Sequence, residues 1–442
     1  MSRAKNKKDL TPEEKRAQAL VPPEEQPYEV PENWRWVRVG AISSLHRGVS
    51  YKKSEEHKTC LPNDCLILRG GNVKEGYIEF GQDDIFVDRS LVSDEQIVRK
   101  NDVIIVASTG SAKVIGRTGI SITNYTDVAF GAFLMLLRPC NQSDPRYLGY
   151  FFQSSEYRNR IKILASGVNI NNIRADYITD TPCPLPPLSE QNRIVDRIER
   201  LFAALDTAKE KAQAVLASCE ARKAAILHKA FSGELTEKWR KNSQIDLHTW
   251  QRKTLSSITV NYDHKRVPLS KEQRKNLDRK YDYYGASGAI DKVDRYLFDG
   301  KYLLIGEDGA NLVTRSKPIA FIAEGKYWVN NHAHILDVNN EIVMEFLCHY
   351  INSISLLPYV TGSAQPKMTQ AKMNEIPIPI PTYEEQQEIV RQMEMAITCE
   401  AQISVAVENV LTQITALKQS ILARAFRGEL GTNDPAEPAT EL

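Results

Sequence analysis

The chain has 442 residues and a formal net charge of +1, so any nucleic-acid role must come from local basic patches or from a basic partner. Hydrophobic content of 42% and charged content of 26% are ordinary for a folded protein of two or three domains. The sequence has no apolar run of membrane-spanning length and no signal-peptide pattern, and its seven cysteines form neither a disulfide framework nor a paired metal-binding spacing. We therefore expect a cytoplasmic protein.

Two globular stretches with the same order of features follow a charged, proline-rich beginning. Residues 1–33 predict a mobile N-terminal arm. In residues 34–181, short β-branched runs alternate with Gly, Asn and Asp, which predicts a mixed, strand-rich domain with a helix over 147–161. Residues 241–376 repeat this order and predict a second such domain.

Each globular stretch leads through a proline-rich segment into a long helical pattern, over residues 182–240 and 377–431, and a short tail over 432–442 ends the chain. Apolar residues step by four and three along both patterns, which predicts helices that pack through a coiled-coil seam. Each helix of about 43 residues would be roughly 65 Å long. Arg222 and Glu400 interrupt the two seams, and the sequence does not say how they pair.

Capping signals lie at the ends of both helical patterns. Ser189 is a plausible N-cap, and Thr382 with Glu385 fits a capping box. Gly233 and Gly428 are plausible helix stops.

The two helical segments are copies of one another. Glu190 and Gln191 recur as Glu385 and Gln386, and the ending AFSGEL recurs as AFRGEL, all at an offset of 195 residues. Two copies of one long element, each after a globular stretch, imply an internal pseudo-twofold. The predicted fold class is therefore α+β, with two strand-rich domains joined by two long helices.

Catalytic signatures are absent from the sequence. It contains no GxxxxGK[ST] phosphate loop, no GxSxG elbow, no HExxH and no cysteine-rich zinc pattern. It also lacks the Asn/Asp-Pro-Pro-aromatic tetrapeptide with which amino-methyltransferases grip a flipped base. These absences fit a binding subunit, although an active site can be assembled from scattered residues.

The sequence resembles the specificity subunits of type I DNA restriction–modification systems over nearly its whole length. The resemblance is carried by the proline-rich leads, the repeated helix endings, and the motifs RGVSYKK, FGAF, YYGASGAI, GEDGANL and NNHAHIL. It implies two target-recognition domains that read the halves of a split sequence in double-stranded DNA, held apart by two antiparallel helices. It also implies two modification subunits that use S-adenosylmethionine, optionally two motor-nuclease subunits, and no cofactor or catalysis in this chain.

Loop residues able to hydrogen-bond bases or phosphates are the candidate DNA contacts of the first domain. We expect phosphate contacts from the lysines of RGVSYKK, base-edge contacts from RGGN, and close backbone approach at STGSAK. RGGN and STGS are equally explained as strand-connecting turns. The candidates are Lys52, Lys53, Arg69, Asn72, Ser108, Thr109, Ser111 and Lys113.

The second domain offers loops of the same kind. Glu307 or Asp308 could accept a hydrogen bond from a cytosine amino group. His332 and His334 share one strand face and, with these acids, leave a metal site conceivable. Solvated turns are the alternative. The candidates are Ser287, Glu307, Asp308, Asn311, Asn330, Asn331, His332 and His334.

Two further polar loops and a basic run complete the candidate DNA contacts. The loops precede the proline-rich leads at matching places, with Asn169 and Asn171 in one and Gln365 and Lys367 in the other. The basic run is a candidate phosphate-contacting stripe, or else a solvated loop. It comprises Lys265, Arg266, Lys271, Arg274, Lys275, Arg279 and Lys280.

Two rival interpretations remain open from the sequence. The chain could be a non-catalytic scaffold that binds proteins through two modules on a coiled-coil strut. It could also be a nuclease or methyltransferase with a dispersed active site.

Overall fold

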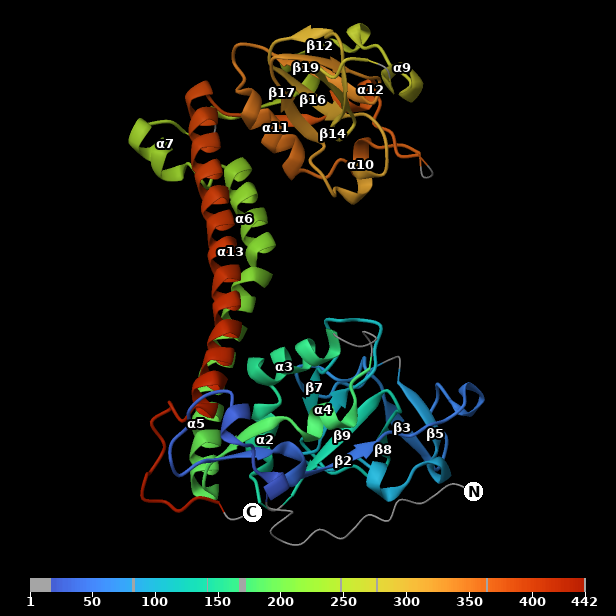
Figure 1. Cartoon of the computed structure of the whole chain (residues 1–442). Helices are drawn as coiled ribbons and strands as arrows, with labels where there is room; N and C mark the ends of the chain where they lie inside the picture. The colour runs from blue at the N-terminus through green and yellow to red at the C-terminus, as the bar shows by residue number, and fades with distance from the viewer. Residues whose placement is uncertain are drawn as a thin grey trace. The chain divides into compact units, whose positions relative to one another are not determined.

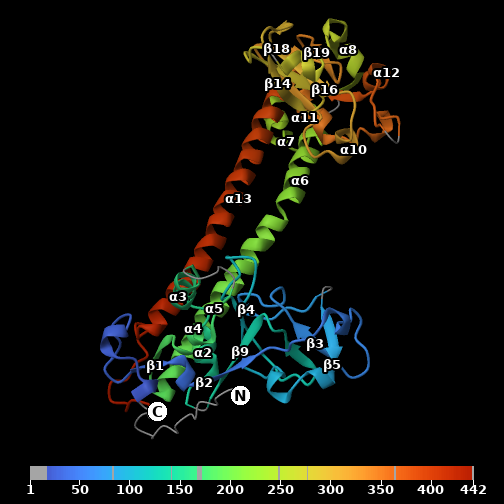
Figure 2. The same cartoon turned by 45° about the vertical axis from the view of Figure 1, so that its right-hand side comes forward.

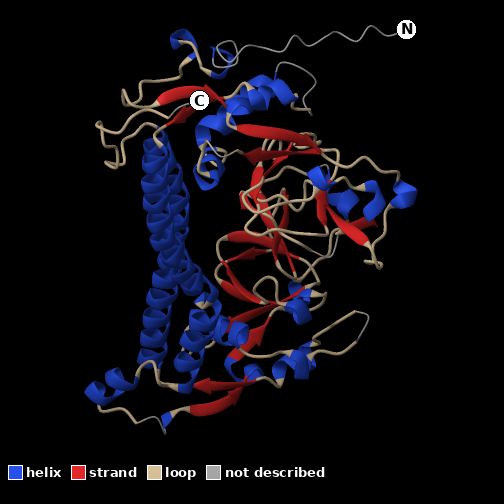
Figure 3. Ribbon diagram, turned by 90° about the horizontal axis from the view of Figure 1, so that it is seen from below, coloured by secondary structure: helices blue, strands red, loops and turns tan. Residues whose placement is uncertain are grey.

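A computed structural model describes residues 17–81, 84–140, 142–166, 172–246, 249–275, 277–362 and 365–440 (Figure 1). The chain divides into two compact units: unit 1 comprises Met1–Lys211 and Val410–Leu442, and unit 2 comprises Ala212–Asn409. The strands gather in the strand-rich head of each unit, while the longest elements are helices (Figure 3). Both long helical segments cross from one unit to the other, so each unit contains part of each.

The described strands in the head of unit 1 form three sheets. The run VIIV forms β6, whose four residues are all buried because it lies in the middle of a five-stranded sheet of order β2-β9-β6-β7-β4. A three-stranded sheet, β5-β3-β8, and the pair β1-β10 complete the strands. The strands are β1 (Arg35–Arg38), β2 (Ser43–Arg47), β3 (Asp64–Leu68), β4 (Gly76–Tyr77), β5 (Ile85–Asp88), β6 (Val103–Val106), β7 (Thr118–Ile120), β8 (Val128–Phe130), β9 (Leu134–Pro139) and β10 (Pro182–Leu185).

The head of unit 2 has the corresponding plan. The run YLLIG forms β16, an interior strand of a four-stranded sheet of order β12-β19-β16-β17. A second four-stranded sheet, β14-β13-β18-β15, and the pair β11-β20 accompany it. The strands are β11 (Gln251–Thr254), β12 (Thr259–Asn261), β13 (Tyr281–Gly285), β14 (Gly288–Val293), β15 (Phe298–Asp299), β16 (Tyr302–Gly306), β17 (Ala320–Ala323), β18 (Lys326–Val329), β19 (Ala333–Val338) and β20 (Pro377–Ile380).

The helices confirm the long elements expected from the seam, but the first of these elements is interrupted. The second pattern is one unbroken helix of 44 residues, whereas the first is divided into α5, α6 and α7. The helix expected over 147–161 is likewise divided, into α2 and α3. The helices are α2 (Pro145–Phe151), α3 (Ser155–Ser166), α4 (Ala175–Thr179), α5 (Leu188–Ala217), α6 (Cys219–Ser232), α7 (Glu237–Ser243), α8 (Leu255–Ile258), α9 (Lys271–Lys275), α10 (Asn311–Thr314), α11 (Met344–Ser353), α12 (Gln370–Asn374) and α13 (Tyr383–Phe426).

The long helices pack antiparallel within each unit. In unit 1 the start of α5, at Ile194, shares a buried cluster with the end of α13, at Leu422. In unit 2 the end of α6, at Ala230, shares a cluster with the start of α13, at Ile389. Helix α2 lies against this helix pair in unit 1 (Figure 2), with the rings of Phe151 and Phe426 5.4 Å apart. Their counterparts at the offset of 195, Phe346 and Phe231, are also 5.4 Å apart.

The repeated glutamines join each head to its helix. The side chain of Gln191 accepts a hydrogen bond from the Asp144 backbone N–H at 2.8 Å and donates to the Pro186 carbonyl at 2.9 Å. Gln386 accepts from the Val343 N–H at 2.8 Å and donates to the Pro381 carbonyl at 3.1 Å. In both units the amide therefore fixes the start of a head helix against the proline-rich lead.

The repeated glutamates bind the end of the opposite helical segment. In unit 1, Glu190 accepts hydrogen bonds from Thr432 at 2.6 Å and from Arg193 at 3.0 Å. Arg193 also makes a two-pronged ion pair with Glu437 in the C-terminal tail, at 2.8 and 2.7 Å.

In unit 2, Glu385 accepts from Thr236 at 2.7 Å, from Arg240 at 2.6 Å and from the Trp250 indole at 2.9 Å. The Glu-Gln repeat thus ties head, helix start and opposite helix end together in each unit.

The capping predictions are partly correct. The Thr382 hydroxyl accepts a hydrogen bond from the Glu385 N–H at 3.3 Å, but the Glu385 carboxylate is used elsewhere, so the reciprocal half of the capping box is missing. Helix α5 begins at Leu188, which places Ser189 inside the first turn rather than at the N-cap. Gly233 follows α6 in the left-handed conformation with φ of 83°, as a helix stop requires.

The two interruptions of the seam pair with each other. In unit 2, Arg222 binds Glu400 with nitrogen–oxygen distances of 2.8–2.9 Å. Arg222 also donates to the Val215 carbonyl, to which the Ser218 hydroxyl donates as well. The first helical segment is interrupted at Ser218, three residues after this carbonyl. Side chains that bind backbone carbonyls compete with the helical hydrogen bonds.

Candidate nucleic-acid interface

Several predicted loops of unit 1 converge around the turn that follows β8. The Ala107 and Ser108 backbone N–H groups both donate to the Phe133 carbonyl at 3.0 Å. Gly48 lies so close to the same turn that a Cβ atom there would be 2.1 Å from the Gly131 carbonyl oxygen. The side chain of Arg117 donates to the Gly70 carbonyl at 2.8 Å, which joins the RGGN turn to the same region.

The side chains of these loops differ in their exposure and in the hydrogen bonds that they make. Lys52, Lys53, Arg69 and Lys113 are exposed. Asn72 is occupied, because its carbonyl accepts from the Arg69 N–H at 2.8 Å and its amide donates to Asp84 at 2.6 Å. The Thr109 hydroxyl accepts from the Ser111 N–H at 3.3 Å and so shapes its own turn.

The loop before the first proline-rich lead lies partly outside the described residues. Asn169 and Asn171 belong to that undescribed part. The neighbouring Asn172 forms a β-bridge with Ser108, so the described end of this loop adjoins the turn after β6.

The loops of unit 2 meet in the same way. Asp308, just after β16, forms a β-bridge with Lys367, and the Gly309 N–H donates to the Pro366 carbonyl at 3.0 Å. The Glu307 N–H donates to the His332 carbonyl at 2.9 Å. The turn containing Ser287 is also close, because a Cβ atom on Gly306 would be 2.6 Å from the Ala286 carbonyl.

A buried charged cluster holds these loops together. Glu307 is 8% exposed; it pairs with Arg266 at 2.6 Å and with Lys367 at 3.0 Å. Burial alone would raise the pKa of Glu307, but the hydrogen bonds from Arg266 and Lys367 outweigh it, and the pKa lies below its ordinary value. Asp263, which Arg266 approaches at 3.3 Å, also has a lowered pKa: burial opposes this, and the hydrogen bond from His334 prevails.

The two histidines play different parts in this cluster. His334 is 1% exposed, with Nδ1 2.5 Å from Asp263 and Nε2 3.0 Å from the Met368 carbonyl. His332 is exposed and lies 2.8 Å from Asp308. Among the described residues no group of three or more His, Cys, Asp or Glu side chains is arranged to hold a metal ion.

The asparagine side chains of these loops mostly form hydrogen bonds within the loops themselves. Asn311 accepts from Ser316 at 3.1 Å and donates to the Lys317 carbonyl at 3.1 Å. Asn330 is buried and accepts from the His332 N–H at 2.8 Å. Asn331 and Gln365 are exposed.

The basic run after β12 is only partly a surface stripe. Arg266 belongs to the buried cluster, and Arg274 pairs with Asp291 at 2.9 Å. The other five members are exposed: Lys265, Lys271, Lys275, Arg279 and Lys280.

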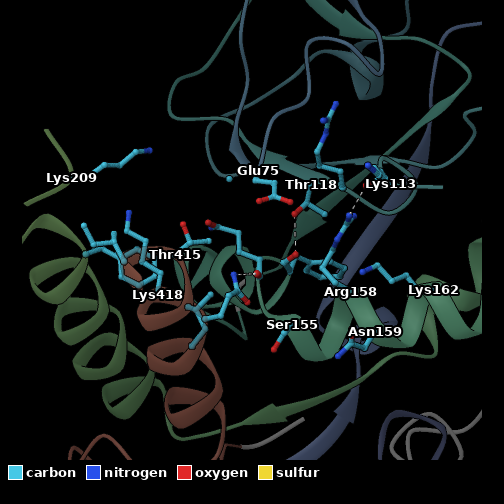
Figure 4. Close-up of a pocket in the computed structure, with 18 of the residues that line it drawn as sticks. Glu75, Lys113, Thr118, Ser155, Arg158, Asn159, Lys162, Lys209, Thr415 and Lys418 are labelled. Carbon is cyan, nitrogen blue, oxygen red and sulfur yellow. Dashed lines mark hydrogen bonds between the residues drawn. The ribbon is translucent and has the colours of Figure 1, made fainter. Parts of the chain in front are cut away.

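A basic cleft of unit 1 was not found from the sequence. It has a volume of about 640 Å³ and lies between α3, the turn after β6, and the paired α5 and α13 (Figure 4). Its members are scattered singly along the chain, and only tertiary packing assembles them. The basic lining residues are Lys113, Arg117, Arg158, Lys162, Lys209 and Lys418.

The fold defines a duplicated class of protein: in each unit a strand-rich head packs on an antiparallel pair of long helices. The family of the type I restriction modification DNA specificity domain matches residues 31–217 and 248–412, and the chain belongs to this family. It is therefore the DNA specificity subunit of a type I restriction–modification system, a non-catalytic component of the complex with two target-recognition domains.

Individual members of the family are similar in sequence to this chain over most of its length. It is 30% identical to the type I restriction enzyme StySPI specificity subunit of Salmonella potsdam, over 92% of this chain and 91% of the relative. It is 29% identical to the EcoKI specificity subunit of Escherichia coli (strain K12), with the same coverage. The fold resembles the crystal structure of the HsdS subunit from Thermoanaerobacter tengcongensis, with a TM-score of 0.61 at 18% identity, over 91% of this chain and 99% of that one.

No described helix is both long and apolar enough to cross a membrane.

Proposed function

We propose that residues 34–181 and 241–376 each read one half of a bipartite target in double-stranded DNA, while the long helices set the gap. The observation that carries this proposal is the repeated plan. In both units the loop after an interior strand, β6 or β16, adjoins the loop before the proline-rich lead. Two equivalent loop groups on a duplicated scaffold suit two separate readings of one duplex.

The exposed loop residues are the proposed contacts. Lys52, Lys53 and Lys113 suit phosphates, because they are exposed lysines on turns. Base edges suit side chains with paired donors or acceptors. For that role we propose the exposed Arg69, Asn331, His332 and Gln365, together with Asp308 and Ser287, which are partly buried.

The occupied residues act indirectly in this proposal. Glu307, His334 and Asn330 are buried, and Asn72 and Asn311 use their amides within their own turns. They fix the loop shapes against which the exposed side chains are held. Lys367 is exposed but forms an ion pair with Glu307, so its ammonium group would have to contact Glu307 and a phosphate at the same time.

The partners follow from the same duplication. We propose that two modification subunits dock on the two equivalent helix surfaces, that they bind S-adenosylmethionine, and that two motor-nuclease subunits can join them. This chain would then bind no cofactor itself, and the complex would act in the cytoplasm. Its contribution to methylation is to place a chosen adenine within reach of a partner's active site.

Methylation mapping tests the proposal. Adenine methylation across the genome should show a split motif when the chain is present and lose that motif when the gene is deleted. Gel shifts of the reconstituted complex should favour DNA carrying this motif over random DNA. Equal affinity for both DNAs, with partner subunits still bound, would instead support a protein scaffold.

A further inference from the structure

The basic cleft of unit 1 is charged well beyond the needs of its own packing. Lys209 and Lys418 approach it from α5 and α13, while Arg158 and Lys162 approach it from α3 (Figure 4). Two carboxylates oppose these charges: Glu75 in the lining, and Asp206, which pairs with Lys418 at 2.6 Å. The remaining balance is strongly positive.

The cations of the cleft differ in the contacts that they already make within the protein. Arg158 holds the turn after β6, because its guanidinium donates to the Ile115 carbonyl at 2.9 Å and to the Lys113 carbonyl at 3.1 Å. Among the residues that the structure describes, Lys113, Lys162 and Lys209 have no carboxylate within ion-pair distance. Within the described part of the chain, three lysines around the cleft therefore carry charge that no paired carboxylate neutralises.

Three of the cations around the cleft are not repeated in unit 2. At the offset of 195, Ser353, Leu357 and Ser404 stand where unit 1 has Arg158, Lys162 and Lys209. A protein partner that docks equivalently on both halves would meet these cations in only one of them. The asymmetry favours a ligand that meets the two heads in different ways, and DNA with two unlike half-sites is such a ligand.

The position of the cleft indicates which part of the DNA it would contact. Lys113 belongs both to the cleft and to the turn of residues 108–113 proposed above to face DNA. A strand passing over that turn toward the helices would enter the cleft. Exposed lysines recognise phosphate and carry no sequence information by themselves.

We propose that this cleft grips the sugar–phosphate backbone of one DNA strand, on the gap side of the half-site read by the first head. The inference rests on the proposed function, since it assumes that the turn of residues 108–113 faces DNA. Lys162 and Lys209 supply the phosphate contacts from opposite walls of the cleft. Lys418 contributes less because Asp206 already neutralises it.

The test uses the reconstituted complex with its modification subunits, a duplex carrying the mapped target, and a random duplex. The double variant Lys162→Gln and Lys209→Gln is compared with wild type across a series of salt concentrations. Lys211→Gln is the matched control, because Lys211 is equally exposed on α5 but lies about 200° around the helix from Lys209, outside the cleft lining.

We expect the double variant to bind both duplexes more weakly, with an unchanged ratio between them. The slope of log K against log salt should fall in magnitude by about 2, because each lost phosphate contact removes roughly 0.9. Phosphate ethylation in the gap next to the first half-site should interfere with wild-type binding and not with the double variant. Lys211→Gln should leave all three measurements unchanged.

The remaining outcomes separate the two proposals. If wild type binds with a steep salt dependence but the double variant keeps the same slope, the cleft inference is wrong and the proposed function stands. If the double variant loses modification subunits while its salt slope is unchanged, the cleft is a protein interface and the inference is overturned. If the wild-type complex shows no preference for the mapped target, the proposed function itself fails.

Discussion

Glu385 and Glu190 occupy matching positions, but the structure predicts unequal effects when each is replaced by alanine. Glu385 is fully buried, and its carboxylate is bound by Thr236, Arg240 and Trp250. Arg240 is itself only 6% exposed. Removing the carboxylate would leave a buried guanidinium without its charge partner, a change that typically costs about 3–5 kcal/mol.

Glu190 is equally buried, but its cationic partner is not. The side chain of Arg193 is 38% exposed and keeps its two-pronged pair with Glu437 when Glu190 is removed. The loss is then that of the hydrogen bonds from Thr432 and Arg193, or about 1–2 kcal/mol. We therefore expect Glu385→Ala to destabilise unit 2 by roughly 2 kcal/mol more than Glu190→Ala destabilises unit 1.

Hydrogen exchange in increasing urea, read by mass spectrometry, measures this contrast because it follows peptides of each unit separately. A single melting temperature would mix the two units. Peptides at the start of α13 should show the larger loss in Glu385→Ala, and peptides at the start of α5 the smaller loss in Glu190→Ala. Equal losses, or a larger one for Glu190→Ala, would refute the reasoning from the burial of the partner.

Three further predictions concern the helix pair, the buried cluster and the gap. Either Arg222→Glu or Glu400→Arg alone should place like charges across the seam and increase hydrogen exchange in α6. The two substitutions together should restore the protection of α6 from exchange. A double variant that stays unprotected would mean that the pair does not act through its charges. The pKa values of Glu307 and Asp263 are lowered in the folded protein, so ionisation of these carboxyl groups stabilises unit 2. This stabilisation should be full above the pKa values that the two groups have in the unfolded chain and lost as pH falls through their lowered folded values, and Glu307→Gln should flatten the dependence of the urea midpoint on pH. Inserting one heptad after Lys211 and one after Asn409 keeps the seam in register and lengthens the helices by roughly 10 Å. Methylation mapping should then show unchanged half-sites with a gap longer by about 3 bp. An unchanged gap would show that the helices do not set it.

The sequence predicted the elements that depend on local pattern. The heptad steps located both long helices, and the repeat at an offset of 195 showed that one plan occurs twice. It did not predict the break at Ser218, where the Arg222 and Ser218 side chains both donate to the Val215 carbonyl. The capping box at Glu385 was half wrong because its carboxylate binds Thr236 and Arg240, which lie 149 and 145 residues away in the sequence.

Periodicity and repetition are properties of the chain itself, so the sequence alone determined that this protein has two strand-rich heads, two long helical segments and a duplicated junction between them. Whether a polar residue faces solvent or a partner depends on segments that meet only after folding. Tertiary structure therefore decided that Arg222 pairs with Glu400, that Glu307 and His334 are buried while His332 is exposed, and that six cations from distant segments surround one cleft.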